Sequence, residues 1–179
     1  RLRALTNGAG YGESAWVAID LLCGHATTNA QSLYNNTYIK HTAGTMNSAF
    51  GDMWNGFYEG IADCNLCLEG MKNMDEKETA QLKGEVYALR AFYYYYLTRL
   101  YGNIPLILEP VTSDSPLMYP EKTNQEKIFE NIILDLKEAE KSGLPNTDET
   151  GRVSLGFVKT LLADVYQYMA CLLYTSPSP

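Results

Sequence analysis

The sequence predicts an all-α protein built from stacked helical hairpins. The first observation is the run at residues 84–105, GEVYALRAFYYYYLTRLYGNIP, which holds a helix and its stop signal together. Its apolar residues recur at alternating gaps of four and three, and Gly102 followed by Pro105 ends the helix. The residues of this stripe are Leu82, Val86, Leu89, Tyr93, Tyr96 and Leu100.

The second observation is an internal repeat of about half this pattern. The later copy keeps the order and spacing of the first, at an offset of 72 residues in every case. The matched positions are Gly84 and Gly156, Val86 and Val158, Leu89 and Leu161, Ala91 and Ala163, Tyr94 and Tyr166, and Tyr96 and Tyr168. Repeats of this length indicate helical hairpins that bury their apolar sides against one another.

Composition allows one domain and argues against several function classes. The chain has 179 residues, of which 46% are hydrophobic, which is enough for one core. A net charge of −7 without any Lys/Arg cluster disfavours nucleic acid and anionic lipid. The longest apolar stretches are interrupted by Asp20, Lys159 and Asp164, so we expect no transmembrane helix. Four unevenly spaced cysteines do not indicate a disulfide framework.

The first element along the chain is a polar segment at residues 1–46. It holds five charged residues among many Asn, Thr, Ser, Gln and Gly, with several aromatic side chains between them. We expect this segment to be mostly loop, with one short helix over residues 13–22. A helical scaffold is expected over residues 47–170.

The first scaffold helix is indicated by a strict four-three alternation of apolar residues, which predicts a continuous buried side. Its members are Phe50, Trp54, Phe57, Ile61, Cys64, Leu68 and Met71. Asp75 with Glu78 is a capping pair that opens the second helix, which then extends to about Tyr101. A connection with four prolines follows over residues 102–122, too many for a helix.

The third helix is expected to open with a T-x-x-E capping box, Thr123 and Glu126, and to stop at Gly143 and Pro145. Its inward residues are predicted to be Phe129, Ile132, Ile133, Leu136 and Ala139. Its water-facing residues are predicted to be Lys127, Glu130, Asp135, Lys137, Glu138 and Lys141.

Ser154 is expected to cap the fourth helix. The apolar side of that helix is predicted to comprise Val158, Leu161, Leu162, Val165 and Met169. Residues 171–179, CLLYTSPSP, show no onward periodicity, and we interpret them as a non-native or truncated tail. The resulting order is helix pair, long loop, helix pair.

Several of these residues resemble the SusD/RagB family of nutrient-binding outer-membrane lipoproteins of Bacteroidetes. On the first two helices they are Trp54, Tyr58, Ile61, Asn65, LKGE at 82–85, LRA at 89–91 and YGNIPL at 101–106. Further on they are NIILDL at 131–136, Ala139, LP at 144–145, GRV at 151–153 and the helix over residues 161–170. The resemblance covers about residues 48–170. It is fairly specific, because a helix motif and the residues that end that helix occur together.

The resemblance implies a scaffold of tetratricopeptide-like hairpins, an α-α superhelix with long loops that bind glycans or other nutrients. It implies no chemical reaction and no cofactor. The implied partners are an oligosaccharide or other nutrient and a SusC-like TonB-dependent transporter in the outer membrane. Contact with the membrane is implied only through a lipidated cysteine at the cell surface, and we expect this chain to be an N-terminal-half fragment without that anchor.

We expect the sugar site of such a protein to lie in the polar segment at residues 1–46. This segment is rich in the neutral amides, hydroxyls and aromatic rings that bind sugars. The candidate ligand-binding residues are Trp16, Asn29, Gln31, Tyr34, Asn35, Asn36 and Tyr38. The alternative interpretation is that these are ordinary turn residues. A rival function is a helical-repeat adaptor that binds a protein segment. Aromatics gathered in a loop-built pocket would favour sugar, and a groove lined by helix faces would favour a peptide.

Several other residues could suggest a functional site, but we expect them to have structural roles. Cys64 and Cys67 form a lone C-x-x-C without a second pair, which favours free thiols over zinc. Cys23 with His25 lacks an orienting acid, so we expect neither catalysis nor a metal site. The four tyrosines at residues 93–96 are expected to pack mainly in the core. Arg90 and Glu85 are expected to form ion pairs between helices.

Overall fold

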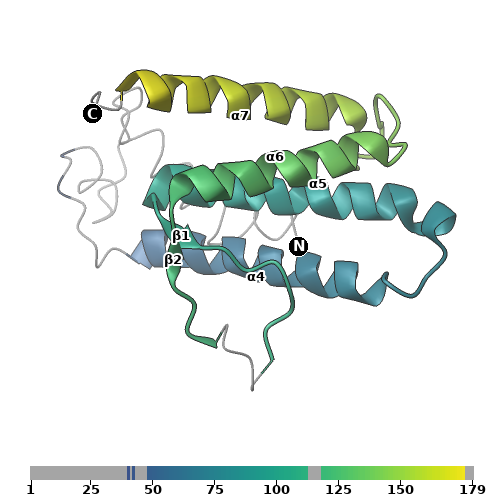
Figure 1. Ribbon diagram of the computed structural model, residues 1–179, viewed down its shortest axis with the longest axis horizontal. Coiled ribbons are helices and arrows are strands. Elements are labelled where there is room, and N and C mark those ends of the chain that lie inside the picture. The colour runs from purple at the N-terminus through teal and green to yellow at the C-terminus, as the bar shows by residue number, and fades with distance from the viewer. Residues whose placement is uncertain (1–39, 41, 43–47, 113–117, 176–179) are drawn as a thin grey trace. The chain divides into compact units, whose positions relative to one another are not determined.

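The computed structural model describes residues 40, 42, 48–112 and 118–175. They form helices α4 (Ser48–Gly70), α5 (Glu76–Tyr101), α6 (Gln125–Lys141) and α7 (Leu155–Thr175). Strands β1 (Ile104–Pro105) and β2 (Lys122–Thr123) pair antiparallel at the base of the long loop (Figure 1). The predicted all-α order of helix pair, loop, helix pair is confirmed. The helix expected over residues 13–22 lies outside the described residues.

The chain divides into two compact units, Arg1–Gly60 and Ile61–Pro179. In the first unit the described residues are mainly the opening turns of α4. Met53 and Phe57 are buried there, whereas Trp54 is half-buried and its ring lies 4.9 Å from that of Tyr58. The buried residue that precedes Phe57 is therefore Met53, one position away from the predicted Trp54.

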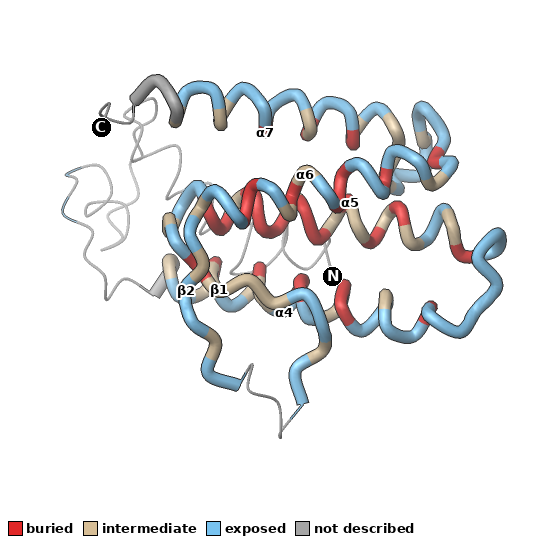
Figure 2. Tube along the Cα trace, in the orientation of Figure 1, coloured by how far each residue is buried: buried red, intermediate tan, exposed pale blue. Residues whose placement is uncertain are grey.

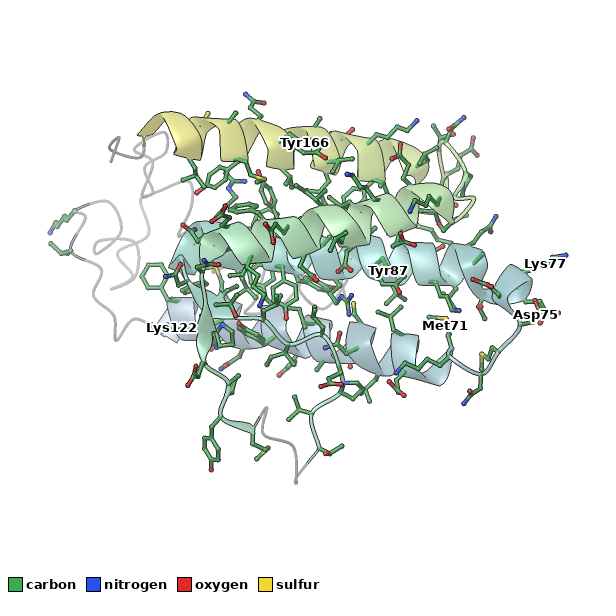
Figure 3. The ribbon with its side chains drawn as sticks, viewed as in Figure 1. Met71, Asp75, Lys77, Tyr87, Lys122 and Tyr166 are labelled. Carbon is green, nitrogen blue, oxygen red and sulfur yellow. The ribbon has the colours of Figure 1, made fainter. Side chains whose placement is uncertain are left out.

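The ends of α5 are fixed by local chemistry, as the sequence predicted. The Asp75 carboxylate accepts hydrogen bonds from the backbone N–H groups of Lys77 (2.8 Å) and Glu78 (3.3 Å), which satisfies donors at the first turn. Figure 3 labels Asp75, Lys77 and Met71 around the turn that joins α4 to α5. At the other end Gly102 has φ +73°, a left-handed conformation that favours glycine, and closes the helix.

The predicted apolar stripe of α5 describes only part of its buried side: Val86 and Tyr93 are buried as predicted. Leu82 and Leu100 are 45% and 40% exposed, whereas Ala88, Tyr94 and Leu97 are fully buried. The reason is that α5 is covered on more than one side: it packs against α6 and α7, and its Arg90 bonds to Asn65 in the second half of α4. Figure 2 shows the resulting run of buried residues along α5.

Helix α6 begins one residue later than its predicted capping box. Thr123 pairs with Ile104 in the small ladder, so the cap is Asn124, whose side-chain oxygen accepts from the Lys127 N–H at 3.1 Å. The helix ends before Gly143, as predicted. Its buried face consists of Ile128, Phe129, Ile132, Asp135, Leu136 and Ala139. Ile128 therefore replaces the predicted Ile133, and Asp135, predicted to face water, is 4% exposed.

Helix α7 begins where Ser154 was expected to cap it, since the Ser154 hydroxyl accepts from the Phe157 N–H at 3.3 Å. Val158, Leu161 and Val165 are buried, in agreement with the predicted apolar side. The helix continues to Thr175, into the residues interpreted as a tail. None of the described helices has both the length and the apolar character needed to cross a membrane.

The repeated glycines lie where another part of the chain comes close. A methyl group on Gly84 would collide with the Ser142 hydroxyl and lie 2.5 Å from the Ser142 Cβ, at the end of α6. A methyl group on Gly156 would lie 3.0 Å from the Asn146 carbonyl oxygen in the α6–α7 turn. The repeat differs at its tyrosines: Tyr94 is fully buried, whereas its counterpart Tyr166 is 45% exposed.

Candidate functional site

The ligand-binding residues predicted in the polar segment lie outside the described part of the chain. These are Trp16, Asn29, Gln31, Tyr34, Asn35, Asn36 and Tyr38, and Cys23 and His25 lie there too. The described residues contain two other features with functional potential. One is an anchored loop after α5, and the other is a groove between α5 and α7.

The loop depends on a buried polar cluster of Arg90, Asp135 and Asn65. Arg90 forms a two-pronged ion pair with Asp135, with Nε–Oδ2 and Nη2–Oδ1 distances of 2.8 and 2.7 Å. Its Nη1 also donates to the Asn65 side-chain oxygen at 2.9 Å. Burial alone would lower the pKa of Arg90, but hydrogen bonding to Asp135 raises it. The cluster therefore joins α4, α5 and α6 through a charged arginine, and it confirms the ion pair expected for Arg90.

This cluster also holds the backbone of the loop. Arg90 donates to the Leu108 carbonyl at 3.2 Å, and the Asn65 amide donates to the carbonyls of Ile107 (3.0 Å) and Glu109 (3.3 Å). The Tyr94 hydroxyl donates to the Ile107 carbonyl at 2.7 Å and accepts from its N–H at 2.8 Å. Burial raises the pKa of Tyr94, so its hydroxyl stays protonated. Residues 107–109 are thereby fixed to the helices.

At its anchor and beyond it, the loop exposes apolar side chains. Leu108 and Val111 are 41% and 43% exposed, Met118 is 50% exposed and Tyr119 is 89% exposed. Such side chains on a segment with a fixed base are suited to contact a partner or the face of a sugar ring.

The second feature, the α5–α7 groove, has a volume of about 440 Å³. Its lining residues come from the two helices that carry the internal repeat: Phe92, Tyr95, Tyr96, Phe157, Thr160, Leu161, Ala163, Asp164 and Gln167. The rings of Phe92 and Tyr96 lie 4.8 Å apart, and Phe157 lies 6.0 Å from Phe92. The groove thus has aromatic walls.

One side of the groove carries polar groups in a fixed arrangement. The Tyr95 hydroxyl donates to Asp164 Oδ2 at 2.8 Å, and the Arg99 guanidinium lies 4.9 Å from the centre of the Tyr95 ring. Burial raises the pKa of Tyr95, and the hydrogen bond to Asp164 raises it further. Among the described residues, neither Asp164 Oδ1 nor the Gln167 amide has a partner.

Sequence reasoning missed this groove. In the sequence, Asp164 stands out only as a charge that interrupts an apolar stretch. A signal was present, because Phe157, Thr160, Asp164 and Gln167 follow one another at gaps of three, four and three and so share one side of a helix. Recognising the site also required knowledge that α5 lies beside α7.

The C-x-x-C pair behaves as two separate thiols. Cys64 is buried and Cys67 is exposed, and both are free. Burial raises the pKa of Cys64 to about 12. Within the part of the chain that the structure describes, no three His, Cys, Asp or Glu side chains gather as metal ligands.

We therefore expect maleimide at pH 7.5 to modify Cys67 in the native protein and to leave Cys64 unmodified, because only the thiolate reacts and Cys64 is buried as the thiol. Peptide mass spectrometry after a short exposure measures both sites. Labelling in denaturant is the control, since both thiols should then react. Rapid native modification of Cys64 would contradict the buried position.

Helices α5, α6 and α7 pack against one another, with an anchored loop between α5 and α6, and this arrangement defines a helical-repeat scaffold. The chain belongs to the SusD-like family: the family model described as "Starch-binding associating with outer membrane" matches residues 7–163. Among curated relatives, SusD-like protein P2 of Formosa agariphila is 34% identical over 128 residues, which cover 70% of this chain and 25% of that protein.

Solved structures agree with this assignment. A SusD superfamily protein from Parabacteroides distasonis is 36% identical with a TM-score of 0.76, over 86% of this chain and 33% of that one. A laminarin-binding SusD-like protein is 29% identical with a TM-score of 0.68, over 80% of this chain and 32% of that one. The chain therefore spans about a quarter to a third of the length of these relatives.

Proposed function

We propose that the protein binds glycans at the cell surface without transforming them, and passes them to a SusC-like TonB-dependent transporter of the outer membrane. The observation that carries this proposal is the family match over residues 7–163. The similarity to a solved laminarin-binding protein supports a sugar ligand and makes laminarin a first glycan to test.

In this proposal the sugar contacts lie in the polar segment. Trp16, Tyr34 and Tyr38 supply ring faces, and Asn29, Gln31, Asn35 and Asn36 supply amides for sugar hydroxyls. The described helices then act as the frame for these contacts. No described residue is assigned a catalytic role.

The transporter contact and the membrane attachment are further parts of the proposal. The exposed apolar side chains of the anchored loop, among them Met118 and Tyr119, support a protein contact there. Attachment would use a lipid anchor, as the family resemblance implies. Co-purification of a TonB-dependent transporter from solubilised outer membranes would support the partnership.

The test of ligand binding is a glycan array probed with the protein, followed by titration calorimetry on each positive glycan. We expect Trp16→Ala and Tyr38→Ala each to weaken binding by roughly tenfold or more, since a lost ring face removes about 1.4 kcal/mol or more. Tyr166→Ala is the matched control, because Tyr166 is an exposed tyrosine on α7, and its affinity should stay within about twofold.

The outcomes separate the parts of this proposal. A protein that binds no glycan on the array would contradict the function. Binding that survives both aromatic substitutions unchanged would move the sugar site away from the polar segment and leave the function standing.

A second candidate function is an adaptor that holds a protein segment. The α5–α7 groove favours it, because the walls of this groove are helix faces. The two functions are compatible, since the groove and the polar segment are formed by different residues.

A further inference from the structure

The attached part of the loop, residues 107–109, is held by side chains of α4 and α5 rather than by its own side chains. Asn65, Arg90 and Tyr94 form hydrogen bonds to its main chain. Of its own three side chains, one is half-buried and two are exposed. A segment with few buried apolar contacts opens at a lower free energy than the core. This segment, which we call the strap, is therefore suited to detach while the helices stay folded.

The hydrogen bonds of the strap depend on one another. Arg90 Nη1 donates to Asn65 Oδ1 at 2.9 Å and to the Leu108 carbonyl at 3.2 Å. The bond to Oδ1 orients the Asn65 amide, so that its Nδ2 faces the strap. The Ile107 carbonyl then accepts from both Asn65 (3.0 Å) and Tyr94 (2.7 Å). Loss of one bond should leave the others less well oriented, so the strap should open as a unit.

The helices have attachments that do not involve the strap. Arg90 pairs with Asp135 on α6 through Nε and Nη2, and uses Nη1 for Asn65 and the strap. Helices α5 and α6 also pack against each other. The start of the loop is fixed as well, because Ile104 is fully buried and pairs with Thr123. An opened strap would therefore move on a fixed base.

We propose that residues 107–109 are a strap that opens and closes as one unit on folded helices, and that closure depends on the Asn65 amide. The closed strap holds Leu108 in a fixed position, where it is 41% exposed. The open strap leaves the Asn65 amide, Arg90 Nη1 and the Tyr94 hydroxyl without their main-chain partners, so that water replaces them. The strap thus changes one surface of the protein between an apolar and a polar form. This device goes beyond the proposed function and is independent of it.

The test measures hydrogen exchange at one amide of the strap. The Ile107 N–H donates to the Tyr94 hydroxyl at 2.8 Å, so its exchange reports opening. Exchange is followed by NMR on the ¹⁵N-labelled protein at several urea concentrations below the unfolding transition. The rate at Ile107 should depend little on urea, whereas the rates at the buried helical residues Ala88 and Ala91 should rise with it. The reason is that only unfolding of the core exposes a large surface.

Two substitutions remove the Asn65 donor and leave the bond between Ile107 and Tyr94 in place. Asn65→Leu removes donor and acceptor together, whereas Asn65→Asp keeps an acceptor for Arg90. Each should speed exchange at Ile107 by about tenfold or more. Tyr94→Phe removes the acceptor of this amide and gives the rate without protection. Leu66→Ala is the matched control, since Leu66 is the exposed neighbour of Asn65 on α4, and the Ile107 rate should stay within about twofold.

A second control separates opening of the strap from a general loss of stability. Gly84→Ala is expected to weaken the fold through its contact with Ser142, which does not involve the strap. It should speed exchange at Ala88 and Ala91 and leave Ile107 within about twofold.

Three results would overturn the proposal. A urea dependence at Ile107 equal to that at Ala88 would show that the strap opens only with the core. Unchanged exchange at Ile107 in both Asn65 variants would show that closure does not depend on this amide. Exchange at Ile107 as fast in the unmodified protein as in Tyr94→Phe would show that the strap is not held. None of these results bears on the glycan array, whose failure would instead contradict the glycan function.

Discussion

Replacing Asp135 with alanine is expected to lower the free energy of unfolding by about 3–5 kcal/mol, because Arg90 is left as a buried, unpaired charge. Asp135 and Arg90 are 4% and 6% exposed and share two hydrogen bonds of 2.7 and 2.8 Å. Urea denaturation followed by circular dichroism measures the loss. The midpoint should fall with little change in the slope if the variant still unfolds in one step.

The matched control is Glu138→Ala, which removes a carboxylate from the same helix. Glu138 pairs with Lys141 at 2.8 Å, but both side chains are more than half exposed, so the loss should stay below about 1 kcal/mol. The double variant Arg90→Met/Asp135→Leu leaves no buried charge and should be more stable than Asp135→Ala. A loss below about 1 kcal/mol for Asp135→Ala would refute the buried pair.

The second large effect is expected for Gly84→Ala. Alanine in a helix interior is normally about 1 kcal/mol more favourable than glycine. At Gly84, however, the new methyl would lie 2.5 Å from the Ser142 Cβ, so α5 and α6 must move apart. Overpacking of this kind costs about 1–3 kcal/mol, and we expect a net loss of stability in urea denaturation.

Gly51→Ala is the control, because it should change the stability of the protein in the opposite direction. Its methyl would meet nothing within 4 Å, so the substitution should stabilise the protein by about 0.5–1 kcal/mol. Removing the obstacle through Ser142→Gly in the Gly84→Ala background should recover stability relative to Gly84→Ala alone. If Gly84→Ala stabilises the protein as much as Gly51→Ala does, the close approach of α5 and α6 is incorrect.

Features fixed by local chemistry could be predicted from the sequence. The start of α5 at Asp75, its end at Gly102 and the stop of α6 at Gly143 each depend on a few neighbouring residues. The repeat at an offset of 72 residues likewise predicted the paired helices. The cap of α6 was missed by one residue, because pairing of Thr123 with Ile104 depends on a segment from another part of the chain.

The ion pair of Arg90 was predicted, but its burial and its partner Asp135 were missed for a different reason. The charge of Asp135 predicts a position on the solvent-exposed side of its helix. Its spacing predicts the opposite, because Ile128, Ile132, Asp135 and Ala139 keep gaps of four, three and four. Arg90 similarly lies four residues after Val86 and seven before Leu97. Two opposite charges on two apolar stripes predict a buried pair, provided that spacing is given more weight than residue type.

Other features required tertiary information. The stripe predicted on α5 is incomplete because it assumes that a helix has one covered side, whereas α5 has several neighbours. The α5–α7 groove depends on two helices that are separated in sequence by the whole of α6. The residues assigned to sugar binding lie outside the described structure, and their role remains a proposal.

The attachment of residues 107–109 through their main-chain atoms has an evolutionary consequence. Asn65, Arg90 and Tyr94 form hydrogen bonds to main-chain groups of the loop, mostly carbonyls, which every residue has. The attachment therefore does not depend on which side chains the loop carries. Natural variation at Leu108, Val111, Met118 or Tyr119 can therefore change the surface that the loop exposes while the main-chain attachment to the helices is kept. The exposed surface of the loop and the helical fold are thus free to diverge at different rates.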